Sequence, residues 1–542
     1  MLYLQLEKAI GRGAVSIRNS LSHRSLPDEL IAEEAWRKDK EKLIEGLNNK
    51  LLKTDIQSIL SHLKEKLTSR YHEVNERVND GTNNKIKLAY NKQGEVIKWT
   101  LPYKREDDGV NNPFYEQLPT TSISEVIRYT ARETGFMRHF KHILPSNSKK
   151  PADESAVAAC VVAKGTGVDT YRMQEICDVK EQELISMEQN FVRLQNLTNA
   201  CDEIINKVAK LPIFEKYTLA NYGIHASVDG QKLETKYNTI KARYSPKYFG
   251  LSCGVSAYTL FANCLPLCTK TIGANEHESY FLYDILSKNT SDVKIEAVSG
   301  DMHSINRVNF ALLYFFGYRF MPRFTKIDAR TKSNLVCFED PDTYKNYIIK
   351  PSNQVNIELI KQEWDNILRI LVTLGLKQNT QSQIVRKLST YNSNATLKAL
   401  IELDKIILSL YMLDYVDDEQ IRKNVHRSLN RGESYHQLRS AIAKISGRKL
   451  VGRNELELSI SNECARLLAI CIIFYNATIL SSLHEYYRGK KMEKECAKII
   501  RYSPVAWQHF NLIGMYTFRS EEEVIDLQRV IEDLIANSRI DF

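Results

Sequence analysis

Three acidic residues, each in a different local sequence context, have carboxylate side chains that could bind divalent cations. Asp229 follows the apolar run 224–228, Asp301 follows the apolar run 293–298, and Glu433 lies in a later helical pattern. Carboxylate oxygens are the protein ligands that Mg²⁺ usually takes. Three converging carboxylates can bind a pair of Mg²⁺ ions, which act on the attacking and leaving oxygens of a phosphodiester. These residues therefore indicate metal-assisted chemistry at a phosphodiester bond.

The segment around the two aspartates has the element order of a ribonuclease H-like fold. Its patterns predict strands at 224–228, 239–244 and 255–261, a helix at 275–287, a strand at 293–298, a helix at 307–316 and a strand at 318–324. In that fold the first and fourth strands are parallel neighbours. A single Asp after a strand is usually a turn residue or a helix cap. Asp229 and Asp301 after the first and fourth strands together favour a shared metal site.

Helical patterns dominate the rest of the chain. Residues up to about 210 are predicted to be almost wholly helical, and Glu433 belongs to a predicted helix over 418–445. The 132 residues from Asp301 to Glu433 (433 − 301) exceed what a bare ribonuclease H fold needs, so we expect a helical insertion between them. The predicted parts are a helical dimerisation or scaffold region 1–105, a helical scaffold or linker region 106–215, the first part of the catalytic core 216–350, the insertion 351–417, the completed core 418–460 and a helical tail 461–542.

Bulk properties fit an intracellular protein with several domains. The 542 residues are too many for one core, and a net charge of +9 is only a weak sign of an anionic partner. The ten cysteines form no CxxC pair, which argues against a zinc site and for a reducing cytoplasm. The uncharged stretch 467–483 contains four polar residues, so a buried helix is favoured over a membrane span.

Several motifs in a fixed order resemble those of the Tn3-family transposases. Ser227-Val228-Asp229-Gly230 resembles the first-aspartate motif of that family, and 241–250, Lys-Ala-Arg-Tyr-Ser-Pro-Lys-Tyr-Phe-Gly, resembles the signature that follows it. Residues 306–323 resemble the segment after the second aspartate, and 429–434, Leu-Asn-Arg-Gly-Glu-Ser, resembles the motif around the catalytic Glu. Weaker similarities lie at 16–36 and 163–167.

The second-aspartate motif departs from the family pattern. The family has Asp-Thr-His-Gly there, whereas this chain has Asp301-Met302-His303-Ser304. If the last position needs a positive φ, Ser304 would restrict the backbone beside a metal ligand. Family members also extend much further at the N-terminus, so the chain is expected to correspond to their C-terminal part.

The resemblance implies a DDE transposase that cuts at the 3′ ends of transposon terminal repeats and joins them to target DNA. Asp229, Asp301 and Glu433 would bind two Mg²⁺ ions, which Mn²⁺ can replace. His303 would contact DNA or a carboxylate, and Arg243, Lys247 and Arg323 would contact DNA phosphates unless they are ordinary surface charges.

The protein is expected to act as a homodimer on DNA. It is expected in the bacterial cytoplasm, associated with the nucleoid and with no membrane. A separate N-terminal DNA-binding polypeptide is one possible partner. Tyr244 and Tyr248 would stack on a splayed base or, as the favoured interpretation, pack on the sheet. Two other functions stay open. One is a catalytically silent remnant that interferes with an intact transposase, and the other is a stand-alone nuclease.

Overall fold

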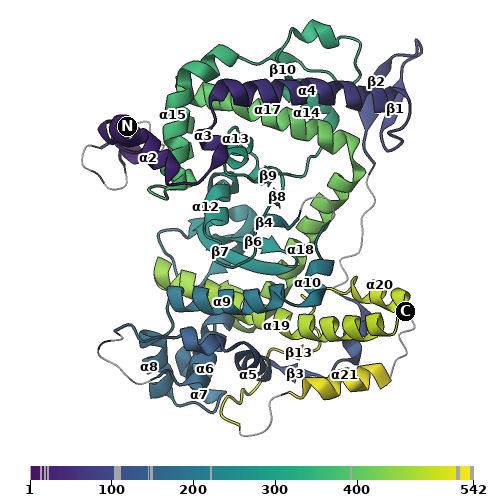
Figure 1. Cartoon of the computed structure of the whole chain (residues 1–542). Helices are drawn as coiled ribbons and strands as arrows, with labels where there is room; N and C mark the ends of the chain where they lie inside the picture. The colour runs from purple at the N-terminus through teal and green to yellow at the C-terminus, as the bar shows by residue number, and fades with distance from the viewer. Residues whose placement is uncertain are drawn as a thin grey trace. The chain divides into compact units, whose positions relative to one another are not determined.

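The computed structural model describes residues 2–11, 15–17, 20, 23–102, 111–144, 146, 151–219, 223–390, 394–520 and 525–536. The chain divides into two compact units (Figure 1). Unit 1 comprises Met1–Arg105, His277–Ser287 and Glu296–His426, and unit 2 comprises Glu106–Glu276, Lys288–Ile295 and Arg427–Phe542. Both units are mainly helical and contain strands, which confirms the predicted mostly helical class with a sheet core. The predicted boundary between residues 105 and 106 lies outside the described residues.

The principal strands of unit 2 form an antiparallel sheet. It is built from β4 (His225–Thr235), β5 (Arg243–Tyr244), β6 (Cys253–Ala262), β7 (Leu265–Gly273) and β12 (Lys449–Leu450). β4 pairs with β6 from Ala226↔Ala262 to Glu234↔Gly254, and β6 pairs in turn with β7. β5 pairs with the first residues of β6, and β12 runs parallel to the last residues of β4.

β7 was not predicted from the sequence, and the strand predicted over 239–244 is shorter than expected. Only Arg243 and Tyr244 of that run are in a strand, whereas β7 is a long strand directly after β6. The two residues between β6 and β7 are Asn263 and Cys264, and both have positive φ (46° and 73°). Two consecutive positive φ values are the geometry of a tight two-residue hairpin turn. The turn was missed because it contains no glycine.

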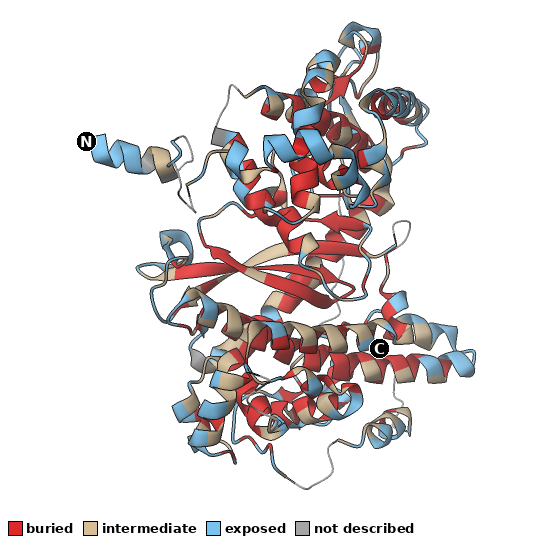
Figure 2. Ribbon diagram, turned by 60° about the vertical axis from the view of Figure 1, so that its left-hand side comes forward, coloured by how far each residue is buried: buried red, intermediate tan, exposed pale blue. Residues whose placement is uncertain are grey.

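The long helix α19 (Glu455–Gly489) forms the centre of the helical part of unit 2. It packs against β7, α5 (Ile123–Thr134), α6 (Glu154–Thr166) and α9 (Leu194–Ala209). By length and composition α19 could cross a membrane, but 94% of its most apolar window is buried in the structure, so this is weak evidence for a span. The prediction that 467–483 forms a buried helix is confirmed. Figure 2 shows the buried residues along the strands and the long helices.

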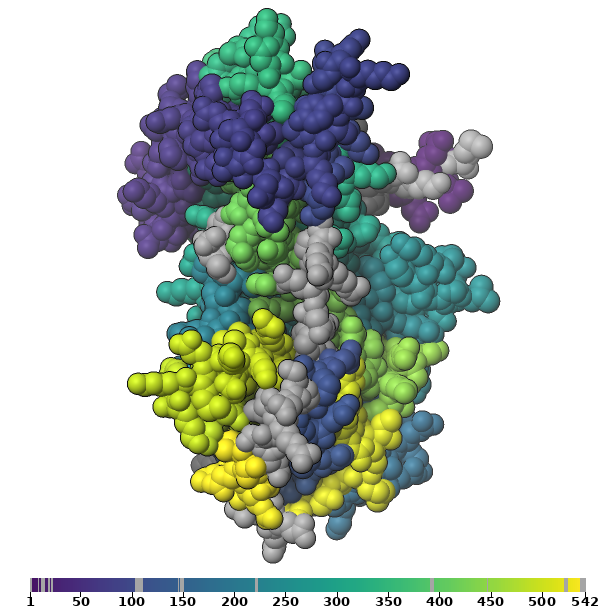
Figure 3. Space-filling view, turned by 90° about the vertical axis from the view of Figure 1, so that its right-hand side faces the viewer, coloured from purple at the N-terminus to yellow at the C-terminus, as the bar shows by residue number. Residues whose placement is uncertain are grey.

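Chain segments far apart in sequence meet in unit 2. The two-residue strand β3 (Thr121–Ser122) pairs in parallel with β13 (Phe510–Asn511). In Figure 3 a blue stretch of the early chain lies beside yellow C-terminal chain. The remaining elements of this unit are η2 (Pro113–Gln117), η3 (Phe136–His139), α7 (Thr170–Glu175), α8 (Glu181–Asn190), α10 (Pro212–Lys216), α11 (Pro246–Phe249), η7 (Lys444–Ser446), α20 (Glu493–Ile499) and α21 (Leu527–Ala536).

Gly165 allows α6 to approach α19 closely. A Cβ at Gly165 would lie 2.7 Å from Leu468 Cδ1 and 3.0 Å from the Ala465 nitrogen, which is backbone and cannot move aside. Gly165→Ala is therefore expected to destabilise unit 2 by about 1–3 kcal/mol, measured by urea unfolding. Gly489→Ala is the matched control, because a Cβ there would meet nothing within 4 Å. Equal unfolding midpoints for the two variants would contradict the prediction.

Unit 1 is built around α4 (Ile56–Asn79) and α17 (Ala395–Asp417), which pack against each other. The apolar face of α4 is buried within this unit, and the Tyr71 hydroxyl donates to the Val336 carbonyl at 2.9 Å. The segment predicted as a helical insertion contains α15 (Ile357–Gly375), α16 (Gln381–Thr390) and α17. Its helical character is therefore confirmed.

Two parallel strands of unit 1 flank the second aspartate. β8 (Ala297–Ser299) pairs with β9 (Arg319–Phe320), and α13 (Asn309–Phe315) connects them. These elements agree with the predicted strand, helix and strand, although both strands are shorter. The other elements of this unit are α1 (Leu2–Gly11), η1 (Pro27–Glu29), α2 (Glu33–Glu45), α3 (Lys50–Lys53), η4 (Glu278–Phe281), α12 (Leu282–Ser287), η5 (Met302–Ser304), α14 (Ile327–Asn334), β10 (Val336–Cys337), η6 (Pro341–Tyr344) and β11 (Asn353–Gln354).

The prediction that the first 210 residues are almost wholly helical was wrong at two places, the two-residue strand β3 and a hairpin. β1 (Lys87–Tyr90) and β2 (Val96–Thr100) form an antiparallel hairpin. Its turn is stabilised by the Asn91 side chain, whose oxygen accepts from the amides of Gln93 and Glu95. Such a side-chain turn competes with helix formation, which explains the break in the helical pattern.

Candidate functional site

Asp229 lies inside β4 and does not follow it, so that part of the prediction was wrong. It pairs with Thr259 of β6, and the pairing continues five residues further, to Glu234. The strand continues because its hydrogen bonds come from backbone groups, so polar side chains do not end it. The Asp229 Oδ1 accepts from the Gly230 amide at 2.8 Å, and about a third of the side chain is exposed.

The face of β4 that carries Asp229 packs against α18 (Glu419–Ala443). Side chains two residues apart point to the same side of a strand, so Ser227, Asp229 and Gln231 share this face. The Ser227 hydroxyl donates to the Ser428 carbonyl at 2.8 Å. The Gln231 amide donates to the His436 carbonyl at 2.9 Å. These two bonds, on either side of Asp229, hold the helix over the strand.

Glu433 lies on α18, as predicted, and its side chain is exposed. The preceding Gly432 lies against β6, since a Cβ there would make an ordinary contact of 3.4 Å with two ring carbons of Phe261. Arg431 donates to the Tyr217 carbonyl at 2.7 Å and fixes the same turn of the helix from the other side. The residues around Glu433 thus serve to position this turn on the sheet.

His436 lies beside Asp229 and was not predicted from the sequence as a site residue. It lies one helical turn after Glu433 on the same face of α18. Its Nδ1 is 3.6 Å from the Asp229 Oδ2. Burial lowers the pKa of His436 to about 4, so the ring is neutral near pH 7 and the contact is no ion pair. The spacing Glu433-x-x-His436 was the available signal.

Asp301 follows β8 in unit 1, as predicted, with Gly300 between them. It caps the short helix η5, and its Oδ1 accepts from the His303 amide at 2.8 Å. The Arg323 amide donates to the Gly300 carbonyl at 2.9 Å, so an exposed Arg323 lies beside the aspartate. Ser304 does not have a positive φ, so the concern that a serine strains this position was wrong.

A buried polar network supports the loop that carries Asp301. The Asn309 amide donates to the carbonyls of Ser304 and Ser279, each at 2.9 Å. Gln381, at the start of α16, donates to the Asn309 side chain at 2.6 Å and accepts from the Tyr283 amide at 2.6 Å. Gln381 and Asn309 are almost completely buried. Helix α16, from the segment predicted as an insertion, therefore helps to fix the Asp301 loop.

His277 is a second histidine that the sequence analysis did not single out. Its ring lies 6.3 Å from the exposed ring of His303, and its Nδ1 is 2.7 Å from the Ser279 hydroxyl. Burial and the neighbouring His303 lower the pKa of His277, and Glu278 and Asp301 partly oppose them. The electrostatic environment of the Asp301 loop thus includes two imidazoles.

Arg243 and Lys247 are exposed in unit 2, on β5 and α11. Tyr244 and Tyr248 are also exposed (53% and 45%), so the favoured prediction that they pack on the sheet was wrong. Phe249 packs on the sheet instead. Gly254 has no side chain, and the Phe249 ring fills the space that a Cβ there would need.

The carboxylates are thus distributed over both units. In unit 2 Asp229 lies on the β4 face that α18 covers and Glu433 is exposed on α18, whereas Asp301 belongs to unit 1. Within each unit, the described residues include no group of three or more His, Cys, Asp or Glu side chains that could hold a metal ion. Carboxylate oxygens are hard donors, so the three predicted side chains match the preference of Mg²⁺ over that of thiolate-binding metals.

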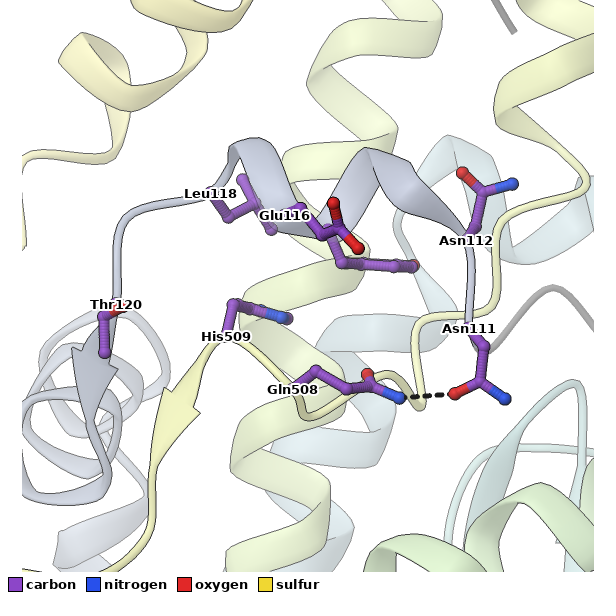
Figure 4. A pocket seen from close by; sticks show the side chains of 8 residues that line it. Asn111, Asn112, Glu116, Leu118, Thr120, Gln508 and His509 are labelled. Atoms are coloured by element: carbon purple, nitrogen blue, oxygen red, sulfur yellow. Dashed lines mark hydrogen bonds between the residues drawn. The ribbon is translucent and has the colours of Figure 1, made fainter.

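A cavity elsewhere in unit 2 contains none of these residues (Figure 4). It has a volume of about 300 Å³ and lies between η2 and the chain before β13. Its polar lining includes Asn111, Gln508 and His509. The His509 Nε2 is 2.9 Å from the Asn476 oxygen, and the Asn476 amide itself donates to two carbonyls, so Nε2 is the protonated nitrogen. The neutral ring is therefore held in one tautomer.

Burial lowers the pKa of His509 to about 3, against about 6.5 in an unfolded chain. Between these values the unfolded state binds more protons, so the free energy of unfolding decreases as the pH decreases below 6.5. We expect a loss of about 2 kcal/mol from this residue at pH 4.5. In urea unfolding, His509→Gln should show a shallower pH dependence than the parent chain. Parallel curves for the two proteins would contradict this prediction.

Comparison with known proteins gives one consistent result. The family model described as the Tn3 transposase DDE domain matches residues 125–516. The transposase for transposon Tn2501 of Escherichia coli is 25% identical over 527 residues, which cover 95% of this chain and 51% of that protein. The transposase for transposon Tn1546 of Enterococcus faecium is 25% identical over 537 residues, 96% of this chain and 51% of that protein. The chain spans about half the length of the curated relatives it matches.

Proposed function

Because the chain belongs to the family of Tn3 transposase DDE domains, we propose that it carries the catalytic centre of a DNA transposase. In this proposal the centre cuts the 3′ ends of transposon terminal repeats and transfers them into target DNA. The observation that carries the proposal is the contact between β4 and α18 within the segment that matches the family: the His436 Nδ1 of α18 is 3.6 Å from the Asp229 Oδ2, and Glu433 lies one helical turn before His436.

The proposed centre is completed when β4 and β8 lie side by side in a ribonuclease H-like sheet. Asp301, after β8, would then join Asp229 and Glu433. These three residues would hold two Mg²⁺ ions, or Mn²⁺ in their place, which would activate the attacking oxygen and stabilise the leaving one. Asp301 is preoriented for this role because its Oδ1 is already bound by the His303 amide.

The neighbouring basic residues would bind DNA. Arg323 lies beside Asp301, and its guanidinium matches the geometry of a phosphate. Arg243 and Lys247 would contact phosphates further along the same DNA, and His303 would approach the scissile phosphate. The acting species would be a homodimer on DNA in the bacterial cytoplasm.

An assay with pre-cut transposon-end DNA tests the proposal directly. The full chain is incubated with DNA that carries a free 3′-OH end, a target duplex and Mg²⁺ or Mn²⁺, and joined products are resolved by electrophoresis. Joined DNA that depends on the end sequence supports the proposal. No product even with Mn²⁺ contradicts it and favours a silent remnant. Cleavage that is independent of the end contradicts it and favours a simple nuclease.

A further inference from the structure

The connection between β4 and β6 exposes apolar side chains that no described part of unit 2 covers. Over residues 236–252 the chain forms the short edge strand β5 and the single-turn helix α11. Five large apolar side chains of this connection are exposed to solvent: Tyr237 37%, Ile240 79%, Tyr244 53%, Tyr248 45% and Leu251 94%. Exposed apolar residues concentrated in so short a segment indicate an interaction surface.

Positive charge surrounds these side chains. Between residues 230 and 252 the sequence has five Lys or Arg residues and one acidic residue, Glu234. The Glu234 carboxylate is paired with the Lys449 ammonium at 2.7 Å. The ammonium groups of Lys247 and Lys232 lie 4.9 Å and 5.8 Å from the ring centre of Tyr248. A partner that fits this surface must therefore be anionic and offer flat apolar groups.

The segment is anchored, so its exposed rings form a fixed surface. Phe249 occupies the space beside Gly254, where a Cβ would be only 2.4 Å from the ring. The same helix turn directs Lys247 and Tyr248 outward. The next residue, Gly250, has φ +58°, a conformation that favours glycine. Leu251 after it is exposed to solvent.

We infer that this surface, the 236–252 platform, binds unstacked bases of the DNA that flanks the cleavage position. The inference rests on the proposed function. Lys232, at its edge, is three residues from Asp229 along β4, about 10 Å between Cα atoms. Because side chains alternate along a strand, Lys232 points to the face opposite Asp229, so the flanking DNA would reach the platform around the edge of the sheet. Aromatic rings stack on bases that have left the duplex, and exposed aliphatic side chains insert between base pairs. Nearby cations bind the phosphates.

Binding to matched and mismatched DNA tests the platform. The affinity of the full chain is measured by fluorescence anisotropy for a duplex and for the same duplex with a central run of mismatched pairs. The double variant Tyr244→Ala/Tyr248→Ala should bind the mismatched DNA about tenfold or more weakly, with a much smaller loss on the matched duplex. Tyr244→Phe/Tyr248→Phe should bind like the parent, because the rings remain.

Tyr171→Ala is the matched control, since Tyr171 is 61% exposed on α7, a different element of the same unit. The inference is overturned if the double alanine variant binds both DNAs as the parent does, or loses equal affinity for both. It is also overturned if light scattering shows lost self-association with unchanged DNA affinity, which would make the surface a contact between copies of the chain.

Failure of the platform and failure of the proposed function give different results. Asp229→Asn should keep the preference for mismatched DNA and lose cleavage. If Asp229→Asn cleaves like the parent, the proposed function fails whatever the tyrosine variants do. If Asp229→Asn is inactive and the double alanine variant binds normally, only the platform fails.

Discussion

Replacing Asp229 with asparagine is expected to reduce cleavage and strand transfer by about a thousandfold or more, because in the proposed centre this carboxylate would bind both metal ions and asparagine would lack its charge. The fold should be unaffected, since an asparagine oxygen can still accept from the Gly230 amide, as Oδ1 does now at 2.8 Å. Cleavage of labelled end DNA under single-turnover conditions measures the effect, and circular dichroism verifies the fold.

Asp301→Asn and Glu433→Gln should give losses of similar size. If the three residues act as one centre, a double variant should be little worse than a single one, because the first substitution already disables the centre. Glu175→Gln, at an exposed position of α7, is the control and should retain full activity. Multiplicative losses in the double variants, or normal activity of any one of the three, would contradict a shared centre.

The largest expected effect on stability comes from Arg466, at the contact between α19 and β7. Its side chain is 1% exposed, and its Nε donates to the Glu463 carboxylate at 2.6 Å. Its Nη1 donates to the Leu267 carbonyl of β7 at 2.7 Å. Arg466→Met would leave a buried carboxylate and strand carbonyls without this donor. We expect a loss of about 3–5 kcal/mol in the free energy of unfolding, measured with urea.

Two further variants separate the buried charge from simple loss of packing. Arg466→Met/Glu463→Gln should recover a large part of the loss, because the buried carboxylate is also removed. Arg488→Met, on the same helix but with its side chain 63% exposed, should change the free energy of unfolding by less than about 1 kcal/mol. A double variant no more stable than Arg466→Met would contradict this account.

Patterns within single elements were predictable from the sequence. The helix with Glu433 was predicted over 418–445 and is observed over Glu419–Ala443, and the uncharged stretch 467–483 lies in a buried helix as expected. The strand before Asp301 was found in the same way. Local hydrophobic periodicity is a property of the sequence itself, so no tertiary information is required.

Features that depend on contacts between distant residues were not predictable. The extension of β4 through Asp229 depends on pairing with β6, and the start of β7 depends on the turn at Asn263 and Cys264. Phe249 packs against the β6 backbone at Gly254, whereas the neighbouring Tyr244 and Tyr248 are exposed.

The types of the catalytic candidates and the family of the chain are properties of the sequence alone, since acidic residues and ordered motifs can be read without coordinates. Tertiary structure alone determined that His436 reaches Asp229, that Gln381 supports the Asp301 loop and that residues 236–252 expose aromatic rings among cations. The reason is physical. Periodicity fixes which face of an element is apolar, whereas the neighbours of a polar side chain are fixed by strand pairing and helix packing across long separations.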